Sequence, residues 1–257
     1  MITSPYLRLA ILQAKKNGKL FKKNFGHPGS VKIKNNDPRN FVTEIDLQIE
    51  TNIRKAIAKN FPKHKIIGEE FSRAPENHTD YFWILDPIDG TTNFINGVPF
   101  CCISIGLWDK HGPLMGVVYN PISEMMYIAE RGKGAYLNGK KITCPKISKL
   151  NEAIGAIGWL YPEGGIKIFS KLVRVCRKVR VYATSTWQAC LVASGNLGFF
   201  TTNEVNIWDI GAAACIVREA GGKITEIDGK PLSLHSQSVL VTAGKIHNEL
   251  IKYTKQL

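Results

Sequence analysis

The chain has 257 residues, enough for one large domain or two fused subdomains. Hydrophobic residues make up 44% and charged residues 21% of the sequence, a balance that excludes wholesale disorder. No run approaches the roughly eighteen apolar residues that a transmembrane helix needs. The first residues lack the apolar core and cleavage site of a signal peptide. The six cysteines form no CxxC pair and are interpreted as buried thiols of a reducing compartment, which predicts a cytoplasmic protein.

The charge is strongly positive. The chain has 34 Lys and Arg against 21 Asp and Glu, a formal net charge of +13. Such an excess attracts nucleic acid, acidic membrane surfaces or phosphorylated small molecules. Two basic runs, Lys15–Lys23 and Lys167–Arg180, are interpreted as solvated helix faces, because no zinc-finger spacing or RNA-recognition signature accompanies them. Charge alone does not choose among these ligands.

The first half of the chain predicts two helices followed by a β-rich region. Residues 4–24 have helical spacing with Ser4 as cap and Pro5 at the first helical position, and a second helix begins after Thr43. Asn138-Gly139 is typical of a two-residue hairpin turn. The short strand-like runs are residues 65–68, 81–85, 101–107, 114–119 and 125–129.

The second half predicts strands that alternate with helices. Strands are expected at 153–158, 179–182, 197–201, 223–227 and 239–242, and helices at 164–177, 186–194, 209–220 and from 246. Gly221-Gly222 supplies a left-handed end for the third of these helices. The pattern predicts an α/β protein with two subdomains, residues 1–145 and 146–257, that share one compact body.

The most informative segment, residues 83–94, is an apolar strand that leads into two aspartates, Asp86 and Asp89, on either side of a predicted proline turn. Both side chains can then converge on one small volume. Two carboxylates that close repel each other unless a cation lies between them, and oxygen-only ligands favour a hard cation, above all Mg²⁺. In the alternative interpretation Asp89 is only a helix N-cap, which accounts for one aspartate but not for the pair.

Three other acidic positions fit the same site. Glu69 follows a short strand, Asp209 heads a small-residue helix, and Asp46 lies in the first turn of the second helix. Each alone has an ordinary interpretation: a surface Glu-Glu pair, an N-cap and an acidic first-turn residue. Gly90 and Thr91 open a helix, and the amides at a helix start suit a phosphate.

Together these residues resemble the inositol monophosphatase family. Residues 86–93 match its first signature, residues 208–222 match its second, and residues 42–46 and 68–70 fall at the expected distances upstream. The resemblance covers essentially the whole chain. It implies a layered αβαβα sandwich, usually a homodimer, and Mg²⁺-dependent hydrolysis of phosphate monoesters that lithium inhibits.

The resemblance also implies roles for single residues. Glu69 and Thr91 would orient the attacking water, Asp46 would steady Thr91, and no serine, cysteine or histidine nucleophile is required. Two or three Mg²⁺ ions would be held by Glu69, Asp86, the carbonyl of Ile88, Asp89 and Asp209. A small phosphorylated substrate would contact Ile88, Asp89, Gly90, Thr91, Thr184, Ser185 and Asp209, with its phosphate on the amides of Gly90 and Thr91.

Substrate choice is where the sequence departs from the family pattern. Sugar-recognising members carry a glutamate where this chain has Thr202, and a glycine where it has Ala183. A missing carboxylate weakens discrimination among substrate hydroxyls. Residues 206–209 also resemble bisphosphate nucleotidases. The expected order is therefore an inositol-type monoesterase first, a 3′(2′),5′-bisphosphate nucleotidase second and a histidinol-phosphate phosphatase third.

A hypothesis of another class is a nucleic-acid-associated regulatory protein that uses the basic faces and retains a vestigial metal site. It predicts binding that falls steeply with salt and little turnover. The hydrolase hypothesis predicts Mg²⁺-dependent phosphate release without any membrane partner.

Overall fold

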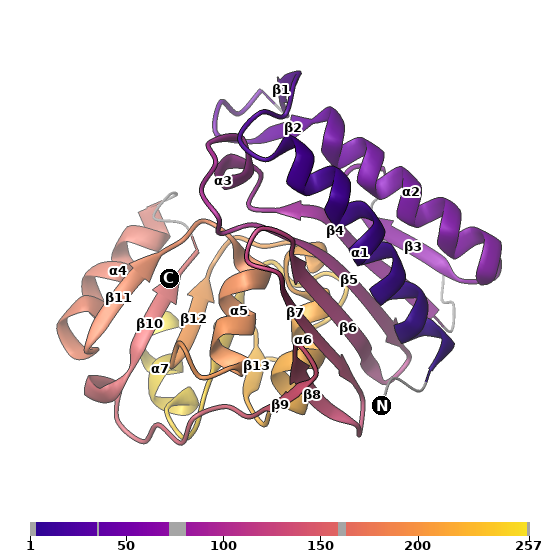
Figure 1. Ribbon diagram of the computed structural model, residues 1–257. Helices are drawn as coiled ribbons and strands as arrows, with labels where there is room; N and C mark the ends of the chain where they lie inside the picture. Colours follow the sequence, from indigo (N-terminus) through magenta and orange to yellow (C-terminus); the bar gives the residue numbers. More distant parts are fainter. Residues whose placement is uncertain (1–3, 35, 72–80, 159–162, 256–257) are drawn as a thin grey trace.

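The computed structural model describes residues 4–34, 36–71, 81–158 and 163–255. Two sheets stand between helical layers, so that the order of layers is αβαβα (Figure 1). No helix in the described parts of the chain is long and apolar enough to cross a membrane. The predicted α/β class and sandwich architecture are confirmed.

The first sheet has seven strands in the order β3-β4-β5-β6-β7-β8-β9. Only β3 and β4 pair in parallel, and every later neighbour is antiparallel. The bounds are β3 Lys65–Gly68, β4 Tyr81–Asp89, β5 Cys102–Asp109, β6 Gly112–Asn120, β7 Met125–Glu130, β8 Gly134–Leu137 and β9 Lys140–Ile142. The last two strands flank the predicted turn, where Asn138 and Gly139 have φ of 47° and 79°.

The second sheet has five strands in the order β11-β10-β12-β14-β13. Its bounds are β10 Ile154–Ile157, β11 Lys178–Val181, β12 Phe199–Thr202, β13 Lys223–Thr225 and β14 Val239–Thr242. The predicted division at residue 145 falls between the last strand of the first sheet and the first strand of the second. The division into subdomains itself stays a prediction, because one hydrophobic cluster includes residues of both halves.

Helices α1 (Pro5–Asn24) and α2 (Glu44–Asn60) cover the outer face of the first sheet. Both begin where the sequence predicts, since Ser4 Oγ accepts from the amide of Leu7 and Thr43 forms a capping box with Asp46. Along β4, Trp83 and Leu85 face these helices while Ile84 faces the layer between the two sheets, as strand alternation requires. Helices α4 (Glu163–Val175) and α7 (His247–Thr254) pack on the far face of the second sheet.

Helices α5 (Ser185–Ala193) and α6 (Gly211–Glu219) fill the layer between the sheets. Here α6 lies against glycines of the first sheet. A Cβ built on Gly116 would lie 2.1 Å from the carbonyl oxygen of Ala212, and one on Gly106 would lie 2.9 Å from its amide nitrogen. Backbone therefore touches backbone, and only glycine fits at these two positions.

Several predicted boundaries differ from the structure. The helix expected at 209–220 is a 3₁₀ turn, Ile207–Asp209, followed by α6. The basic run 167–180 is not one helix, because α4 ends at Val175 and β11 begins at Lys178. A ribbon of two short strands, β1 (Val31–Ile33) and β2 (Phe41–Thr43), was not predicted; β1 is only three residues long and wholly exposed. The short helix expected after Gly90 is α3, Thr91–Ile95.

Candidate active site

Strand β4 carries two aspartates into the interior. Asp86 is 2% exposed and Asp89 is 5% exposed. The predicted proline turn between them is wrong, because β4 continues through Pro87 to Asp89 while its register against β5 shifts. Proline lacks an amide hydrogen, and strands tolerate it where the ladder is interrupted. The irregularity places both carboxylates at the same end of the sheet.

Asp86 is an acid surrounded by acids. Burial raises the pKa of its carboxyl well above the ordinary value, and the charges of Glu69, Asp89, Asp209 and Asp46 raise it further. One oxygen, Oδ1, is buried without a hydrogen-bond partner in the described structure. Such an oxygen is costly to bury unless something else satisfies it.

Asp89 is bound to the beginning of helix α5. Its Oδ1 accepts from the amide of Ser185 (2.9 Å), while Oδ2 accepts from the amide of Trp187 (3.1 Å), the hydroxyl of Thr184 and the thiol of Cys102 (3.5 Å). Burial still raises the pKa of Asp89 to about 6, although these donors lower it. Asp89 is therefore a capping residue, but for a helix nearly a hundred positions away and not for α3. The sequence placed Thr184 and Ser185 near the substrate without indicating this contact.

The strand end at Glu69 and Glu70 meets a lysine that sequence reasoning missed. Lys34 Nζ donates to Glu69 Oε1 at 2.7 Å and to Glu70 Oε1 at 2.5 Å. Burial alone would lower the pKa of Lys34, but the two carboxylate charges outweigh it and raise the pKa. Burial and the Glu69 charge raise the pKa of Glu70 to about 8. No local signal predicts this contact, because Lys34 follows a short exposed strand and lies 35 residues before Glu69.

Asp46 joins helix α2 to the β4 end. Its Oδ2 accepts from the amide and hydroxyl of Thr43 at 2.8 and 2.5 Å, and its Oδ1 lies 3.4 Å from Thr91 Oγ1. Thr91 Oγ1 is also 3.0 Å from the carbonyl oxygen of Ile88. Burial raises the pKa of Asp46 to about 7. The structure thus brings Asp46, Thr91 and Ile88 together.

Asp209 approaches from the other half of the chain. Its Oδ2 accepts from the amide of Asn206 at 2.6 Å, and its backbone carbonyl accepts from the hydroxyl of Thr186 at 2.6 Å. Burial raises its pKa well above the ordinary value, and the charges of Glu69 and Asp89 raise it further. Asp209 is thus both part of a cap and part of the acidic group.

These donors fit a divalent cation. In the parts of the chain that the structure describes, no three acidic, histidine or cysteine side chains already stand at the spacing of a metal centre. The Asp86 environment nevertheless holds several repelling carboxylates and one unsatisfied oxygen. A hard cation would neutralise the repulsion and occupy that oxygen.

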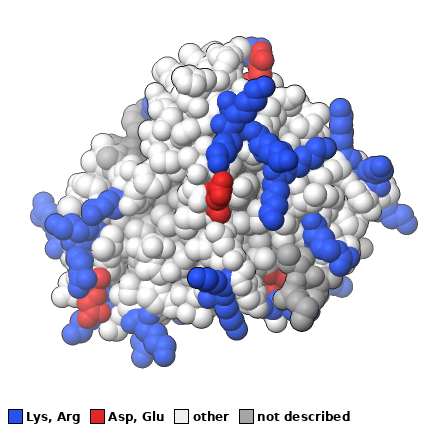
Figure 2. Space-filling model, in the orientation of Figure 1, with Lys and Arg blue, Asp and Glu red and all other residues white. Residues whose placement is uncertain are grey.

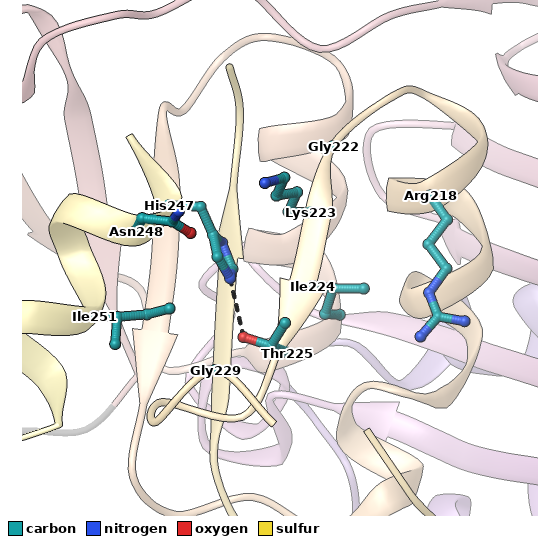
Figure 3. A pocket seen from close by; sticks show the side chains of 9 residues that line it. All are labelled: Arg218, Gly222, Lys223, Ile224, Thr225, Gly229, His247, Asn248 and Ile251. Carbon is teal, nitrogen blue, oxygen red and sulfur yellow. Dashed lines mark hydrogen bonds between the residues drawn. The ribbon is translucent and has the colours of Figure 1, made fainter. Parts of the chain in front are cut away.

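A hollow elsewhere in the described structure contains none of the predicted site residues. It has a volume of 390 Å³, opens at the far end of α6 from Asp209, and is lined by Arg218, Lys223 and His247 among others (Figure 3). His247 is 3% exposed and its ring nitrogens lie 2.8 Å from Thr242 Oγ1 and 3.0 Å from Thr225 Oγ1. Both ring nitrogens of this histidine are used in hydrogen bonds that stabilise the fold, so the chemistry is assigned to the acidic site.

The comparisons with known proteins agree with this assignment. The model of the inositol monophosphatase family matches residues 3–257. The chain is 34% identical to the fructose-1,6-bisphosphatase/inositol-1-monophosphatase of Thermotoga maritima over 98% of this chain and 96% of that protein. It is also 34% identical to the Nus factor SuhB of Escherichia coli over 88% and 86% of the two chains.

The fold is also similar to solved structures. An inositol monophosphatase from Thermotoga maritima superposes with a TM-score of 0.89 at 33% identity, over 97% of this chain and 96% of that one. Sequence and fold therefore agree along nearly the whole chain. The chain belongs to the inositol monophosphatase family and is a phosphoric monoester hydrolase of that family.

Proposed function

We propose that this enzyme hydrolyses a small phosphate monoester with Mg²⁺, and that the substrate is of the inositol phosphate type. The observation that carries the proposal is Asp86, a buried carboxylate with an unsatisfied oxygen and four other carboxylates near enough to raise its pKa. A structural role does not require this arrangement, because a buried charge without a partner costs stability.

The proposed cation ligands are Glu69, Asp86, Asp89, Asp209 and the carbonyl of Ile88, for two or three Mg²⁺ ions. When bound, Mg²⁺ would supply a water of lowered pKa and neutralise the charge that develops on the phosphate. Lys34 now makes ion pairs with Glu69 and Glu70, so we propose that the lysine gives up one of these ion pairs when the cation binds. Lithium inhibition belongs to the same proposal.

We propose that Thr91 and Glu69 orient the attacking water. If the Thr91 hydroxyl donates to Asp46, the lone pairs of its oxygen are free to accept a hydrogen bond from that water. Asp46 is held at this position by two contacts from Thr43. The Thr43–Asp46–Thr91 series therefore supports the roles proposed for Asp46 and Thr91.

The space for the phosphate is proposed beside Gly90, whose φ is +86°. A Cβ at this residue would lie 2.8 Å from the carbonyl oxygen of Phe100, so any other residue would crowd the turn. A bare backbone lets an anion approach the amides of Gly90 and Thr91 closely. The rest of the substrate would contact Thr184, Ser185 and Asp209.

Inositol 1-phosphate remains first among substrates, with a bisphosphate nucleotide second and histidinol phosphate third. Thr202 stands where sugar-recognising members carry a glutamate. As a threonine it has no carboxylate for substrate hydroxyls, and it is fully buried in β12. The name of the Thermotoga maritima relative adds fructose 1,6-bisphosphate to the candidates. We also propose a homodimer in the cytoplasm.

The test is release of inorganic phosphate from inositol 1-phosphate, fructose 1,6-bisphosphate, adenosine 3′,5′-bisphosphate and histidinol phosphate, each with and without Mg²⁺ and Li⁺. We expect Mg²⁺-dependent turnover that is greatest on inositol 1-phosphate and falls with Li⁺. A clear preference for the adenosine compound would promote the nucleotidase, and turnover of none of the four would reject the proposal.

A second candidate function is nucleic-acid association through helix α1. The helix contains no acidic residue, and its lysines at 15, 16, 19, 22 and 23 are all exposed. Figure 2 shows basic side chains gathered along this helix. The relative named Nus factor SuhB favours testing this function.

The test is binding of a single-stranded RNA to the full chain at several salt concentrations. Charge reversal at Lys15 and Lys19 would weaken binding and reduce the salt slope by about 1 for each phosphate that is no longer neutralised, while phosphate release stays unchanged. Equal binding by the variant and the parent chain would reject α1 as the RNA-binding surface.

A further inference from the structure

The side chain of Asn93 joins three separate segments near the acidic site. Asn93 lies in helix α3, and its Nδ2 donates to the carbonyl oxygen of Phe100 at 2.8 Å and to that of Tyr182 at 2.7 Å. The carbonyl oxygen of Ala183 is 3.4 Å away. The two short bonds use both hydrogens of the amide, so the side chain is fully committed to backbone oxygens.

The segment that Asn93 holds has an unusual backbone. Ala183 has a φ of +53°, in the left-handed region that costs a residue with a Cβ about 1 kcal/mol or more. Asn36, Glu124 and Asn138 are the other described residues that share this region without being glycine. Unlike the asparagines, alanine has no polar side chain that could compensate locally, so the surrounding contacts must hold the turn in place.

The residues that follow this turn surround Asp89. The hydroxyl of Thr184 and the amides of Ser185 and Trp187 all donate to the Asp89 carboxylate. The turn at Ala183 therefore determines where these three donors lie, and the donors determine which way Asp89 points.

Packing around the junction is tight. The rings of Phe100 and Tyr182 have centroids 4.8 Å apart, and a Cβ on Gly90 would lie 3.3 Å from Cβ of Thr184. The segment before β5, the turn before α5 and the start of α3 thus meet where Asn93 donates. Removal of its two hydrogen bonds would free the most strained of these segments.

We propose that Asn93 is a positioning residue, which holds the left-handed turn at Ala183 so that the start of α5 orients Asp89 for the cation. The inference rests on the proposed function in one respect, that Asp89 is a ligand of Mg²⁺. The clamp itself, from Asn93 through Ala183 to Asp89, is a property of the fold.

The experiment compares Asn93→Ala with Asn96→Ala in the full chain. Asn96 is a matched control, because it is the next residue after α3 and, among the described residues, its Nδ2 donates within its own turn, to the carbonyl oxygen of Thr92 at 2.8 Å. A third variant, Asn93→Ala with Ala183→Gly, tests rescue, because glycine adopts the left-handed turn without the clamp. Each variant is measured by hydrogen exchange of the 182–187 peptide, by Mg²⁺ titration calorimetry and by phosphate release.

We expect Asn93→Ala to speed exchange in residues 182–187 and to weaken Mg²⁺ binding and kcat/KM by about 10- to 100-fold, the usual cost of losing support behind a metal ligand. Asn96→Ala should match the parent chain in all three measurements. The double variant should recover at least about half of the loss on a logarithmic scale, since glycine removes the strain at residue 183.

Three outcomes would overturn the proposal. Unchanged exchange in Asn93→Ala would show that Asn93 does not hold the turn. Faster exchange with unchanged Mg²⁺ binding would reduce Asn93 to a structural residue, and absence of rescue by Ala183→Gly would reject the strained turn as the link. If the parent chain exchanges as expected but binds no Mg²⁺ and releases no phosphate, the proposed function has failed, and the positioning role fails with it while the clamp stands.

Discussion

Buried polar groups near the two ends of helix α6 differ in whether their hydrogen bonds are satisfied. Beyond its C-terminal end, His247 is buried and both ring nitrogens have hydroxyl partners, at 2.8 and 3.0 Å. Near its N-terminal end, Asp86 is as deeply buried, but one of its oxygens has no partner among the described residues. In both groups burial shifts the pKa in the direction that favours the neutral form. It lowers the pKa of His247 to about 4 and raises the pKa of Asp86.

The difference separates a structural group from a functional one. A neutral imidazole between two hydroxyls has all its hydrogen bonds and contributes to the fold. A carboxylate that other carboxylates repel has a cost that protonation or a bound cation can offset. Burial and a shifted pKa are therefore not sufficient to identify a functional residue, whereas an unsatisfied oxygen beside like charges is a stronger signal.

The largest effect that the comparison predicts is that of Asp86→Asn. If Asp86 is the cation ligand proposed above, loss of its charge should lower phosphate release by about 10³-fold or more, because metal stabilisation of the transition state amounts to several kcal/mol. The same change removes a repelled charge, so the metal-free protein should melt higher, by about 2–4 °C for each kcal/mol gained. Measurement of phosphate release checks the expected loss of activity, and thermal melting without metal checks the expected gain of stability.

The matched control is Asp228→Asn, an aspartate whose carboxylate pairs with Lys230 at 2.7 Å on the surface. This variant should leave both measurements unchanged. A drop in melting temperature for Asp86→Asn would mean that the Asp86 carboxylate stabilises the fold, and the contrast with His247 would disappear.

The next effect is a pH dependence of stability that belongs to His247. Its pKa is about 4 in the fold against about 6.5 in the unfolded chain. The unfolded state therefore binds the proton more tightly, and the contribution of His247 is full above about pH 6.5 and is lost as the pH falls toward 4. Between pH 7.5 and 5.0 the loss should be about 2 kcal/mol.

Urea unfolding of the parent chain and of His247→Gln at the two pH values isolates this contribution. The raised pKa values of Asp46 and Asp89, about 7 and 6, act with the opposite sign, since they favour the fold as the pH falls. The difference between the two chains cancels them. His235→Gln, at an exposed histidine, serves as control, and equal pH slopes in all three chains would contradict the assignment.

The smallest effect is expected from Thr184→Val, which removes one of the donors to Asp89. A hydrogen bond to a charged group contributes about 1.5–3 kcal/mol, but the amides of Ser185 and Trp187 remain. We expect a loss of about tenfold in kcat/KM, or about 1.4 kcal/mol, measured by steady-state phosphate release.

Thr201→Val is the matched control, because Thr201 is buried in β12 and its hydroxyl donates to the carbonyl oxygen of Val239 at 3.0 Å. It should lower stability without lowering kcat/KM. Equal activity losses in both variants would mean that Thr184 acts only through general stability.

Sequence patterns within a few residues predicted most helices and strands, but they did not predict contacts between distant parts of the chain. The caps at Ser4 and Thr43 and the turn at Asn138-Gly139 depend on neighbours within four residues, so the sequence pattern contains them. The ribbon of β1 and β2 was missed because β1 has no buried face. The continuation of β4 through Pro87 was missed because proline is typically a strand end.

The candidate site shows the same limit. The sequence identified the acidic residues by type and spacing, and the structure brings their charges together. It gave no indication of the pairing of Lys34 with Glu69 and Glu70, or of the way that Asp89 binds the start of α5. Both contacts join positions 35 or more residues apart, and no periodicity encodes such a distance.

The contact of Ala212 with Gly106 and Gly116 has a consequence for how this enzyme can change over evolution. The spacing between Asp209, just before α6, and the first sheet is set by main chain lying on main chain. A side chain at residue 106 or 116 would push α6 away from the first sheet and would move Asp209 with it. These two positions therefore limit which substitutions the enzyme can accept, although neither glycine lies in the acidic site.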